Sequence, residues 1–597
     1  MDAVFRKSHS NNNSRSTSAQ LAIVKFDAWF SGANVEEGKT MILDEYPVGS
    51  RKYLRTFVAV AFATTAFAAA TPAKADSCSN LAKTFHRPKT TITMAQTVPA
   101  GTFVSPAADT LPNMPKFCRV AGFATPSSDS HIQFEVWLPQ SGWNLKYLQV
   151  GCGGYCGAVP YTSMADPLRR GYVVAATDDG NQSNAIDTSW AVGHPEKVVD
   201  WGYRAIKETT DVAKGLIFAF QNSGPQRSYF LGCSNGGREA LMEAQHYPRD
   251  FDGIIAGSPG NNWTHLMSGF AYNVAALQGI SSGDLSQSDL DTLSKSTLAE
   301  CAGKDGGLST DQFLNNPRAC GFDPKKLSLS KEKIEAIEKI FSGPRGIFPG
   351  YQGGSGEANS FVDWPLWLTG SGNPAAGLQG AFAISTFTKL VFPNSGWTPT
   401  SFTAADNAKQ ADKELGAIAN SIDPDLRVFT SHGGKLIQYA GWSDSAISPQ
   451  NDLDYFHALN REMGKGATRE FYRLFMVPGM AHCNGGPGAN AFGQAFTPSG
   501  PNPSDPAADI ISALDNWVVN GRVPEQINAT KYVNDDPNQG VAFQRPLCAF
   551  PNIAKYNGRG STAAASSFEC VRPDDDERLG HDDHDDHQHE QRLGANR

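Results

Sequence analysis

The chain has 597 residues, of which 40% are hydrophobic and only 19% are charged, a composition typical of a globular protein with a large core. Its formal charge of −9 gives no basic surface for nucleic acid, so we expect no nucleic-acid partner. The sequence after residue 75 has no apolar run long enough to span a membrane, which argues against a protein with several membrane spans.

Residues 51–75 have the pattern of a secretory signal peptide. A basic stretch, RKYLR, precedes the apolar run TFVAVAFATTAFAAA, and small residues follow at Ala73 and Ala75. We therefore assign residues 1–75 to a non-mature segment and expect a secreted or periplasmic protein that does not associate with the membrane. A short membrane anchor is the alternative. Because a signal peptide belongs at the N-terminus, we expect translation to start near Met41 or Val48.

Residues 573–597 form an acidic, histidine-rich run that has no apolar periodicity. The run contains PDDDERLGHDDHDDHQHEQ, and we expect it to be a disordered tail because it cannot bury a hydrophobic face. Its histidines offer loose metal binding, although a solvated tail is the simpler interpretation.

Between residues 130 and 260, short apolar runs alternate with amphipathic stretches. Strands are predicted at 132–139, 146–151, 171–180, 228–232 and 251–259, and helices at 199–220 and 237–248. This alternation predicts an α/β fold with a mainly parallel sheet. Residues 261–425 are richer in Gly, Ser, Asn and Trp and look like an insertion, and the pattern returns after 425. We therefore predict one α/β domain, 76–260 and 426–572, interrupted by a second domain at 261–425.

Residues 232–236 read Gly-Cys-Ser-Asn-Gly and match the G-x-S-x-G motif of a nucleophilic serine. The motif follows a predicted strand and precedes a predicted helix, which is the context that it requires. In such a turn, strained backbone lifts the serine off the sheet, and small neighbours prevent a clash. We predict Ser234 as the nucleophile, and a plain glycine-rich turn is the alternative.

A serine nucleophile needs a base, and the base needs an acid that orients it. In hydrolases of this fold the acid follows the serine along the chain, and the histidine follows the acid. The segment LIQYAGWSD ends at Asp444 and RLFMVPGMAHC contains His482, each just past a predicted strand. We predict these two residues as acid and base. The weaker competitors are His194, His246, His265, His432 and His457 for the base, and Asp452 and Asp454 for the acid.

The ten cysteines of an exported chain permit five disulfides with none left over. Proximity in the sequence suggests Cys78–Cys118, Cys152–Cys156, Cys301–Cys320 and Cys548–Cys570. Cys233 and Cys483 remain, and they adjoin Ser234 and His482. If the serine and the histidine lie within hydrogen-bond reach, these two cysteines are close, and a disulfide between them closes a loop of about 250 residues. Two unrelated cysteines are the alternative.

An oxyanion hole needs two backbone N–H donors. One is expected from Asn235, directly after the nucleophile. The other is expected from the glycine-rich turn in KYLQVGCGGYCG, with Gly153 and Gly154 as its candidates.

Taken together, these features resemble the tannase and feruloyl esterase family, and the resemblance covers nearly all of residues 76–572. The shared segments are GCSNGGREAL, VGCGGYCG, VGHPEKVVDWGYRA, AGWSD and VPGMAHCNGG. The resemblance implies an α/β-hydrolase with a large lid domain inserted between nucleophile and acid, which would be residues 261–425. The family includes the bacterial hydrolase of mono(2-hydroxyethyl) terephthalate.

The resemblance also implies a calcium ion in the lid, in the loop CAGKDGGLSTDQFLNNPRAC between Cys301 and Cys320. Asp305 and Asp311 are the remaining candidate ligands, because Ala302 stands where the family has its first carboxylate. Calcium takes six to eight oxygen ligands, carboxylates among them, and this loop lacks one carboxylate of the family's set. The disulfide is a second way to hold the loop.

These observations predict a secreted serine carboxylic ester hydrolase that needs no cofactor for its chemistry. The resemblance suggests an aromatic acyl group, and the lid aromatics at 364, 367, 382, 387, 392 and 397 are candidates for its pocket. We expect feruloyl esters as substrates, alone or attached to plant polysaccharide or polyphenol. Galloyl esters come second and terephthalate monoesters third. A non-catalytic binding protein on a hydrolase fold is the alternative from a different class.

Overall fold

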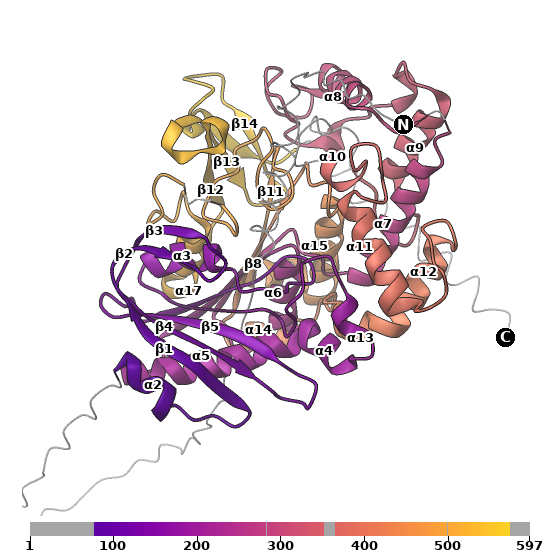
Figure 1. Ribbon diagram of the computed structural model, residues 1–597. Helices are drawn as coiled ribbons and strands as arrows, with labels where there is room; N and C mark the ends of the chain where they lie inside the picture. Colours follow the sequence, from indigo (N-terminus) through magenta and orange to yellow (C-terminus); the bar gives the residue numbers. More distant parts are fainter. Residues whose placement is uncertain (1–76, 282, 352–363, 498–499, 574–597) are drawn as a thin grey trace, which may run out of the picture.

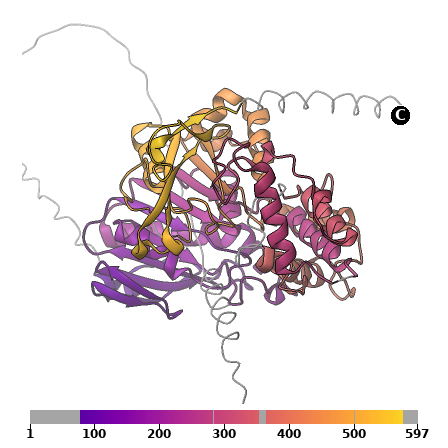
Figure 2. The ribbon, with the colours of Figure 1, turned by 90° about the horizontal axis from the view of Figure 1, so that it is seen from above.

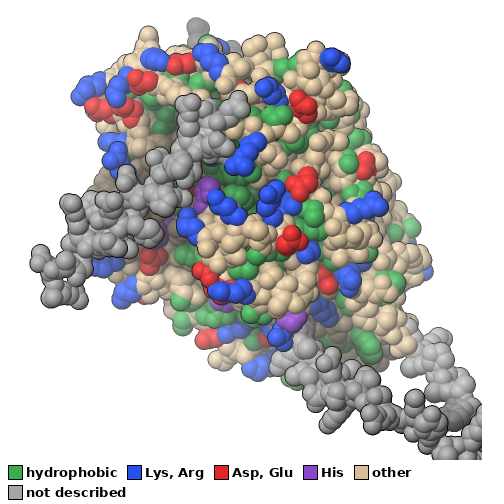
Figure 3. All heavy atoms as spheres, turned by 180° about the vertical axis from the view of Figure 1, so that it is seen from behind, with side chains coloured by type: hydrophobic (Ala, Val, Ile, Leu, Met, Phe, Trp, Pro, Cys, Tyr) green, Lys and Arg blue, Asp and Glu red, His purple; other side chains and the backbone are tan. Residues whose placement is uncertain are grey.

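The computed structural model describes residues 77–281, 283–351, 364–497 and 500–573. The predicted signal peptide at 51–75 and the acidic tail beyond residue 573 lie outside these ranges. Within them, no helix combines the length and the hydrophobicity needed to cross a membrane. On the face shown in Figure 3, basic, acidic and hydrophobic side chains are interspersed.

A nine-stranded sheet forms the centre of the fold, in the order β1-β4-β5-β7-β6-β8-β9-β10-β11. The six strands from β7 to β11 in this order run parallel, whereas β1, β4 and β5 pair antiparallel at one edge. The predicted α/β fold with a mainly parallel sheet is confirmed. The strands are β1 Thr90–Val98, β4 Phe117–Ala124, β5 Ile132–Pro139, β6 Lys146–Val150, β7 Val173–Thr177, β8 Arg227–Cys233, β9 Gly253–Gly257, β10 Lys435–Gly441 and β11 Tyr472–Val477.

Helices cover both faces of the sheet because successive strand residues point to opposite sides and both sets are apolar. On β6, Tyr147 joins the core under α5, α6 and α15, whereas its neighbour Leu148 joins the core under α3 and α17. These helices are α3 Tyr161–Arg169, α5 Ala205–Gln221, α6 Asn235–His246, α15 Pro449–Met463 and α17 Ile510–Asn520. The sheet is therefore buried on both faces, and its polar chemistry gathers at the strand ends.

The inserted segment 261–425, which follows β9, is mainly helical and gathers at one side of the sheet in Figures 1 and 2. Its helices are α7 Trp263–Gln278, α8 Gln287–Cys301, α9 Lys331–Ser342, α10 Trp364–Trp367, α11 Leu378–Thr386, α12 Ala404–Ala411 and α13 Ala417–Ala419. They share one apolar core with Tyr155 and Trp201 of the sheet region. The segment thus lies against the sheet region, and its assignment as a separate lid domain stays a prediction.

The structure also contains strands that the sequence patterns do not predict. They are β1 and β4 in the central sheet and three two-stranded sheets built from β2 Gly101–Val104, β3 Thr110–Met114, β12 Gln526–Tyr532, β13 Val541–Cys548, β14 Ile553–Tyr556 and β15 Phe568–Val571. Strand β1 has only one fully buried residue, at its end, so it lacks the apolar alternation that marks a strand. Half-exposed strands of this kind depend on their pairing partners more than on their own sequence.

The remaining helical elements are short. The α-helices are α2 Cys78–Thr84, α4 Pro195–Val199, α14 Arg427–Ser431 and α16 Lys465–Phe471. The π-helical turns are η2 Asp200–Arg204, η5 Phe387–Val391 and η6 Asp412–Gly416. The 3-10 turns are η1 Ser189–Ala191, η3 Pro317–Ala319, η4 Pro324–Lys326, η7 Val533–Asp535, η8 Pro537–Gln539 and η9 Ala565–Ser567.

Candidate active site

Ser234 occupies the turn between β8 and α6. Its backbone has φ 64° and ψ −123°, a combination that costs strain for a residue with a side chain and that is typical of functional turns. The N–H of Ser234 donates to the carbonyl of Gly257 at 3.0 Å, so the neighbouring strand β9 holds the turn. The residue is 8% exposed. The structure therefore presents the serine on a fixed, strained turn above the sheet.

Two glycines make this turn sterically possible. A Cβ at Gly232 would lie 2.2 Å from the carbonyl oxygen of Gly236, far inside contact distance. A Cβ at Gly236 would lie 2.9 Å from the backbone of Cys152, which carries the glycine-rich turn after β6. Both glycines of the motif are thus needed for packing, and the second allows the two backbone segments to approach each other.

Asp444 and His482 form a buried pair at the ends of β10 and β11. The Nδ1 of His482 lies 2.7 Å from Oδ2 of Asp444, and the two side chains are 2% and 1% exposed. The other carboxylate oxygen of Asp444 accepts the N–H groups of Ala446 and Ile447, both at 2.8 Å. These bonds fix the carboxylate, which in turn holds the imidazole with its Nε2 directed away from the acid.

The Nε2 of His482 is buried and has no hydrogen-bond partner among the described residues. A buried nitrogen without a partner is costly, and such atoms mark functional sites. A disulfide joins Cys233 to Cys483, the residues directly beside Ser234 and His482, with their Cα atoms 6.0 Å apart. The structure therefore ties the serine turn covalently to the loop of the base.

The other cysteines pair as expected from proximity, so all ten are in disulfides. The four further bonds are Cys78–Cys118, Cys152–Cys156, Cys301–Cys320 and Cys548–Cys570. The Cys152–Cys156 bond spans the glycine-rich turn that was predicted to supply an oxyanion donor.

Most backbone N–H groups around the serine turn are already bonded. The amide of Cys152 donates to the side chain of Glu239, the amide of Tyr155 to the carbonyl of Ala185, and the amide of Gly236 to the carbonyl of Cys152. Among the described residues, those of Gly153, Gly154 and Asn235 have no such acceptor. The structure thus leaves open the three amides that the sequence nominated as oxyanion donors.

Aromatic side chains of the inserted segment reach this region. The ring of Trp367 meets that of His482 at a centroid distance of 5.1 Å, and it lies nearly parallel to Phe382. The ring of Phe382 in turn approaches Gly154, because a Cβ built there would lie 3.0 Å from it. Phe387 instead stacks on Trp397 within the segment. Of the six aromatic residues considered, Trp367 and Phe382 therefore border the candidate site.

The two candidate calcium ligands have other partners. The carboxylate of Asp305 accepts backbone N–H groups of Gly307, Asn315 and Asn316. Asp311 forms an ion pair with Arg545 at 3.0 Å. A guanidinium at this position repels a cation, and both carboxylates are already engaged with other partners, whereas calcium needs six to eight oxygen ligands. These residues therefore do not fit a calcium site.

The competing candidates lie in other surroundings. His265 pairs with Asp412 and His194 with Asp129. Asp452 is buried and accepts the side-chain N–H of Gln438, and burial raises its pKa well above the usual range, which favours the neutral acid.

Sequence reasoning missed Glu239, which is fully buried under the serine turn. Its Oε1 accepts the side-chain N–H of Asn235 at 2.6 Å, and its Oε2 accepts the N–H of Cys152 at 3.2 Å. Asn235 and Glu239 are four residues apart on one helix, a spacing that brings side chains together. That spacing, directly after the nucleophile, is the signal that could have identified this residue.

Comparison with known proteins identifies the family of the chain. The family model "Tannase and feruloyl esterase" matches residues 118–571. The chain is 37% identical to an uncharacterized esterase of Xanthomonas campestris pv. campestris, over 88% of this chain and 95% of that protein. It is 28% identical to a probable feruloyl esterase B-2 of Aspergillus oryzae, over 83% and 95%.

Solved structures show the same fold. The crystal structure of feruloyl esterase B from Aspergillus oryzae superposes with a TM-score of 0.75 at 28% identity, covering 83% of this chain and 99% of that one. Tannin acyl hydrolase from Aspergillus niger superposes with a TM-score of 0.64 at 23% identity, covering 81% and 92%. The chain belongs to the tannase and feruloyl esterase family, and it is an esterase on an α/β-hydrolase fold.

Proposed function

We propose that this protein is a secreted serine esterase that hydrolyses esters of hydroxycinnamic acids, with Ser234, His482 and Asp444 as its catalytic triad. The observation that carries the proposal is the buried His482, bonded to Asp444 through Nδ1 and tied by the Cys233–Cys483 disulfide to the serine turn. Its unpartnered Nε2 is the atom that takes the proton of the serine in this mechanism.

The reaction has two steps. His482 Nε2 accepts the proton of Ser234 as Oγ attacks the ester carbonyl, and the amides of Asn235 and the 153–154 turn stabilise the resulting oxyanion. The tetrahedral intermediate collapses, and the C–O bond to the alcohol breaks as His482 returns the proton to the leaving oxygen. Water then attacks the acyl-enzyme with His482 again as base, which releases the acid and restores Ser234.

The preference for an aromatic acyl group is supported by the ring surfaces at the site. Trp367 lies against the base and Phe382 beside the oxyanion turn, so two aromatic rings flank the position of the reacting carbonyl. Flat rings of a substrate gain both apolar burial and ring–ring contact on such surfaces. The names of the relatives, among which feruloyl esterases recur, favour hydroxycinnamoyl over galloyl groups.

The test is a substrate panel with the mature protein: methyl ferulate, methyl caffeate, methyl gallate and mono(2-hydroxyethyl) terephthalate, compared by kcat/KM. We expect the two hydroxycinnamates to be hydrolysed fastest and the Ser234→Ala variant to be inactive on every ester. Equal rates across the panel would refute the substrate assignment. Full activity of Ser234→Ala would refute the proposed mechanism.

A further inference from the structure

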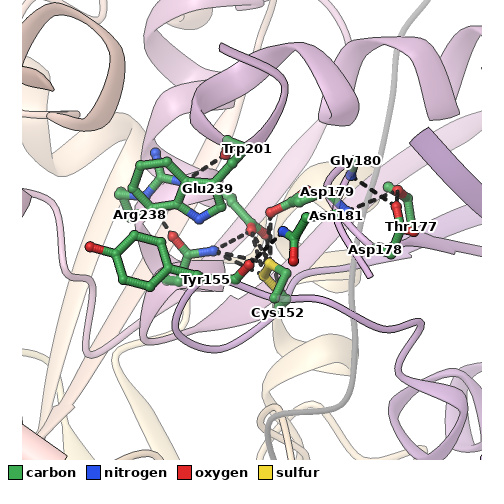
Figure 4. Close-up of a disulfide and its surroundings, with 12 residues drawn as sticks. Cys152, Tyr155, Thr177, Asp178, Asp179, Gly180, Asn181, Trp201, Arg238 and Glu239 are labelled. Carbon is green, nitrogen blue, oxygen red and sulfur yellow. Dashed lines mark hydrogen bonds between the residues drawn. A yellow bond between two sulfur atoms is a disulfide. The ribbon is translucent and has the colours of Figure 1, made fainter. Parts of the chain in front are cut away.

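The carboxylate of Glu239 connects the two backbone segments that supply the candidate oxyanion donors. One oxygen accepts the N–H of Cys152, the residue before Gly153, and the other accepts the side-chain N–H of Asn235. Figure 4 shows Glu239 and Asp179 beside the Cys152 disulfide, and Arg238 next to Trp201. A single side chain is thus bonded to the turn after β6 and to the first residue of α6.

Asn235 is held from its other end as well. The Nε of Arg238 donates to Oδ1 of Asn235 at 2.6 Å. Arg238 is itself fixed, because it donates to the backbone carbonyls of Trp201 and Gly202 and its guanidinium lies 4.3 Å from the indole centroid of Trp201. With both ends of its amide bonded, the side chain of Asn235 cannot rotate, and the backbone N–H of the same residue keeps its direction.

The charge state of Glu239 follows from its neighbours. Burial raises the pKa of both Glu239, to about 7, and Asp179, well above its usual range. Two adjacent buried carboxylates oppose each other's ionisation, and the hydrogen bond between them lowers the pKa of Glu239 while it raises the pKa of Asp179. The positive charge of Arg238 lowers the pKa of Glu239 and favours its anionic form. Glu239 is therefore the member of the pair that accepts hydrogen bonds.

We propose that Glu239 is a positioning residue, which sets the separation and direction of the oxyanion donors on Asn235 and on the 153–154 turn. This inference rests on the proposed serine esterase mechanism. Glu239 does not touch the reacting atoms. Its contribution passes through two hydrogen bonds whose partners adjoin the donors, and a misplaced donor stabilises the transition state less than a fixed one.

The substitution Glu239→Gln separates this role from simple packing. A carboxylate accepts on both oxygens, whereas an amide offers one acceptor and one NH₂ group. In Glu239→Gln the NH₂ must therefore face a donor, either the N–H of Cys152 or the amide of Asn235. Size and burial stay the same, but one of the two bonds is lost and replaced by a repulsive contact.

Glu243 supplies a matched control one turn along the same helix. It is equally buried, and its carboxyl oxygens have no hydrogen-bond partner among the described residues, so Glu243→Gln makes the same chemical change without touching either segment. The assay is methyl ferulate hydrolysis, with kcat referred to the fraction of Ser234 titrated by a fluorophosphonate. This reference removes any difference in the folded fraction.

We expect Glu239→Gln to lower kcat about 10- to 100-fold with little change in KM, because the oxyanion forms after substrate binds. An arylboronic acid, which forms a tetrahedral adduct on the serine, should bind correspondingly more weakly. Glu243→Gln should change neither quantity. If kcat and boronate affinity of Glu239→Gln equal those of Glu243→Gln, the inference is wrong. Full activity of Ser234→Ala in the same assay would instead remove the mechanism on which it rests.

A double-mutant cycle with Asn235→Ala tests the route of the effect. If Glu239 acts through the side chain of Asn235, then Glu239→Gln should cost less in the Asn235→Ala background than in the native protein. Additive losses would contradict the proposal. The cycle also covers the case in which Glu239→Gln folds poorly, since Asn235→Ala removes the same bond from the other side.

Discussion

The indole ring of Trp367 lies against the imidazole of His482, with centroids 5.1 Å apart and planes at 81°. A residue of the inserted segment thus touches the base of the proposed triad directly. This edge-to-face arrangement packs an aromatic ring against the imidazole, beside the position proposed for the acyl group.

Replacing Trp367 should therefore affect aromatic substrates most. We expect Trp367→Leu to lower kcat/KM for methyl ferulate about 10- to 100-fold, because an apolar contact with the substrate ring is lost. The loss should be smaller for p-nitrophenyl acetate, whose acyl group is too small to reach the indole. Trp364→Leu is the control, since Trp364 packs on Phe341 within the segment. Equal losses on both esters would show that Trp367 acts only through the fold.

Removing the acid should impair the chemical step without disturbing binding. In Asp444→Asn the amide no longer favours a proton on Nδ1 of His482, so the base is held in the wrong tautomer. We expect kcat for methyl ferulate to fall by about 10⁴-fold. Steady-state kinetics at neutral pH measures this. A loss below tenfold would assign the role of the acid to another residue, and Asp452→Asn then becomes the next variant to examine.

The Cys233–Cys483 disulfide should contribute more to stability than a disulfide that closes a short loop. The chain-entropy model gives about 5 kcal/mol for its loop and about 3 kcal/mol for that of Cys548–Cys570. The two bonds span 250 and 22 residues. We expect urea midpoints of the two double serine variants to rank accordingly, and only the first variant to lose kcat. The reverse order would show that native contacts, and not loop closure, determine the stabilisation.

Glu243 should make the protein less stable as pH rises. Burial raises its folded pKa well above the usual range, so between about pH 4.3 and that value the folded protein holds a proton that the unfolded chain has lost. The free energy of unfolding therefore falls with rising pH, by up to about 1.4 kcal/mol per unit from this group. Glu243→Gln removes the contribution of this group to the pH dependence of the free energy of unfolding. Its advantage in urea unfolding should be larger at pH 8 than at pH 5, and a constant difference would contradict the assignment.

Divalent cations should not affect the stability of the loop between Cys301 and Cys320. Asp311 already has Arg545 as its partner, and Asp305 is bonded to three backbone amides. We expect the Tm measured by calorimetry to be the same in EDTA and in calcium chloride. Asp311→Asn should lower it in both, since it leaves the guanidinium of Arg545 without its partner. A rise of several degrees in Tm with calcium, and not with EDTA, would show that the loop binds the ion.

The parts of the fold that could be predicted from the sequence are those with strong local patterns. Strands β6 to β11 are largely buried on both faces and read as mainly apolar runs, and the G-x-S-x-G motif sits in the required strand–turn–helix context. Strand β13 has no such pattern, because four of its eight residues are not fully buried and because it contains Pro546. Its position depends on its pairing with β12, and no local sequence pattern indicates that pairing.

The proposed site divides in the same way. Ser234, Asp444 and His482 each follow a strand, so their order along the chain was sufficient to nominate them. Trp367 lies in the inserted segment, and no sequence pattern indicates how the helices of that segment pack on the sheet. Only the structure therefore shows its contact with His482. The ion pair of Asp311 with Arg545 bridges 234 residues, and no spacing rule could have identified it.

The bond between Cys233 and Cys483 also makes the proposed catalytic geometry depend on where the chain folds. It forms only after residue 483 has been synthesised and only where thiols become oxidised. A copy retained in a reducing compartment would lack the link between the serine turn and the loop of the base. Hydrolysis of a chromogenic ester by this protein would then report on oxidative maturation, and cells making it could be assayed for the export of folded protein by colour alone.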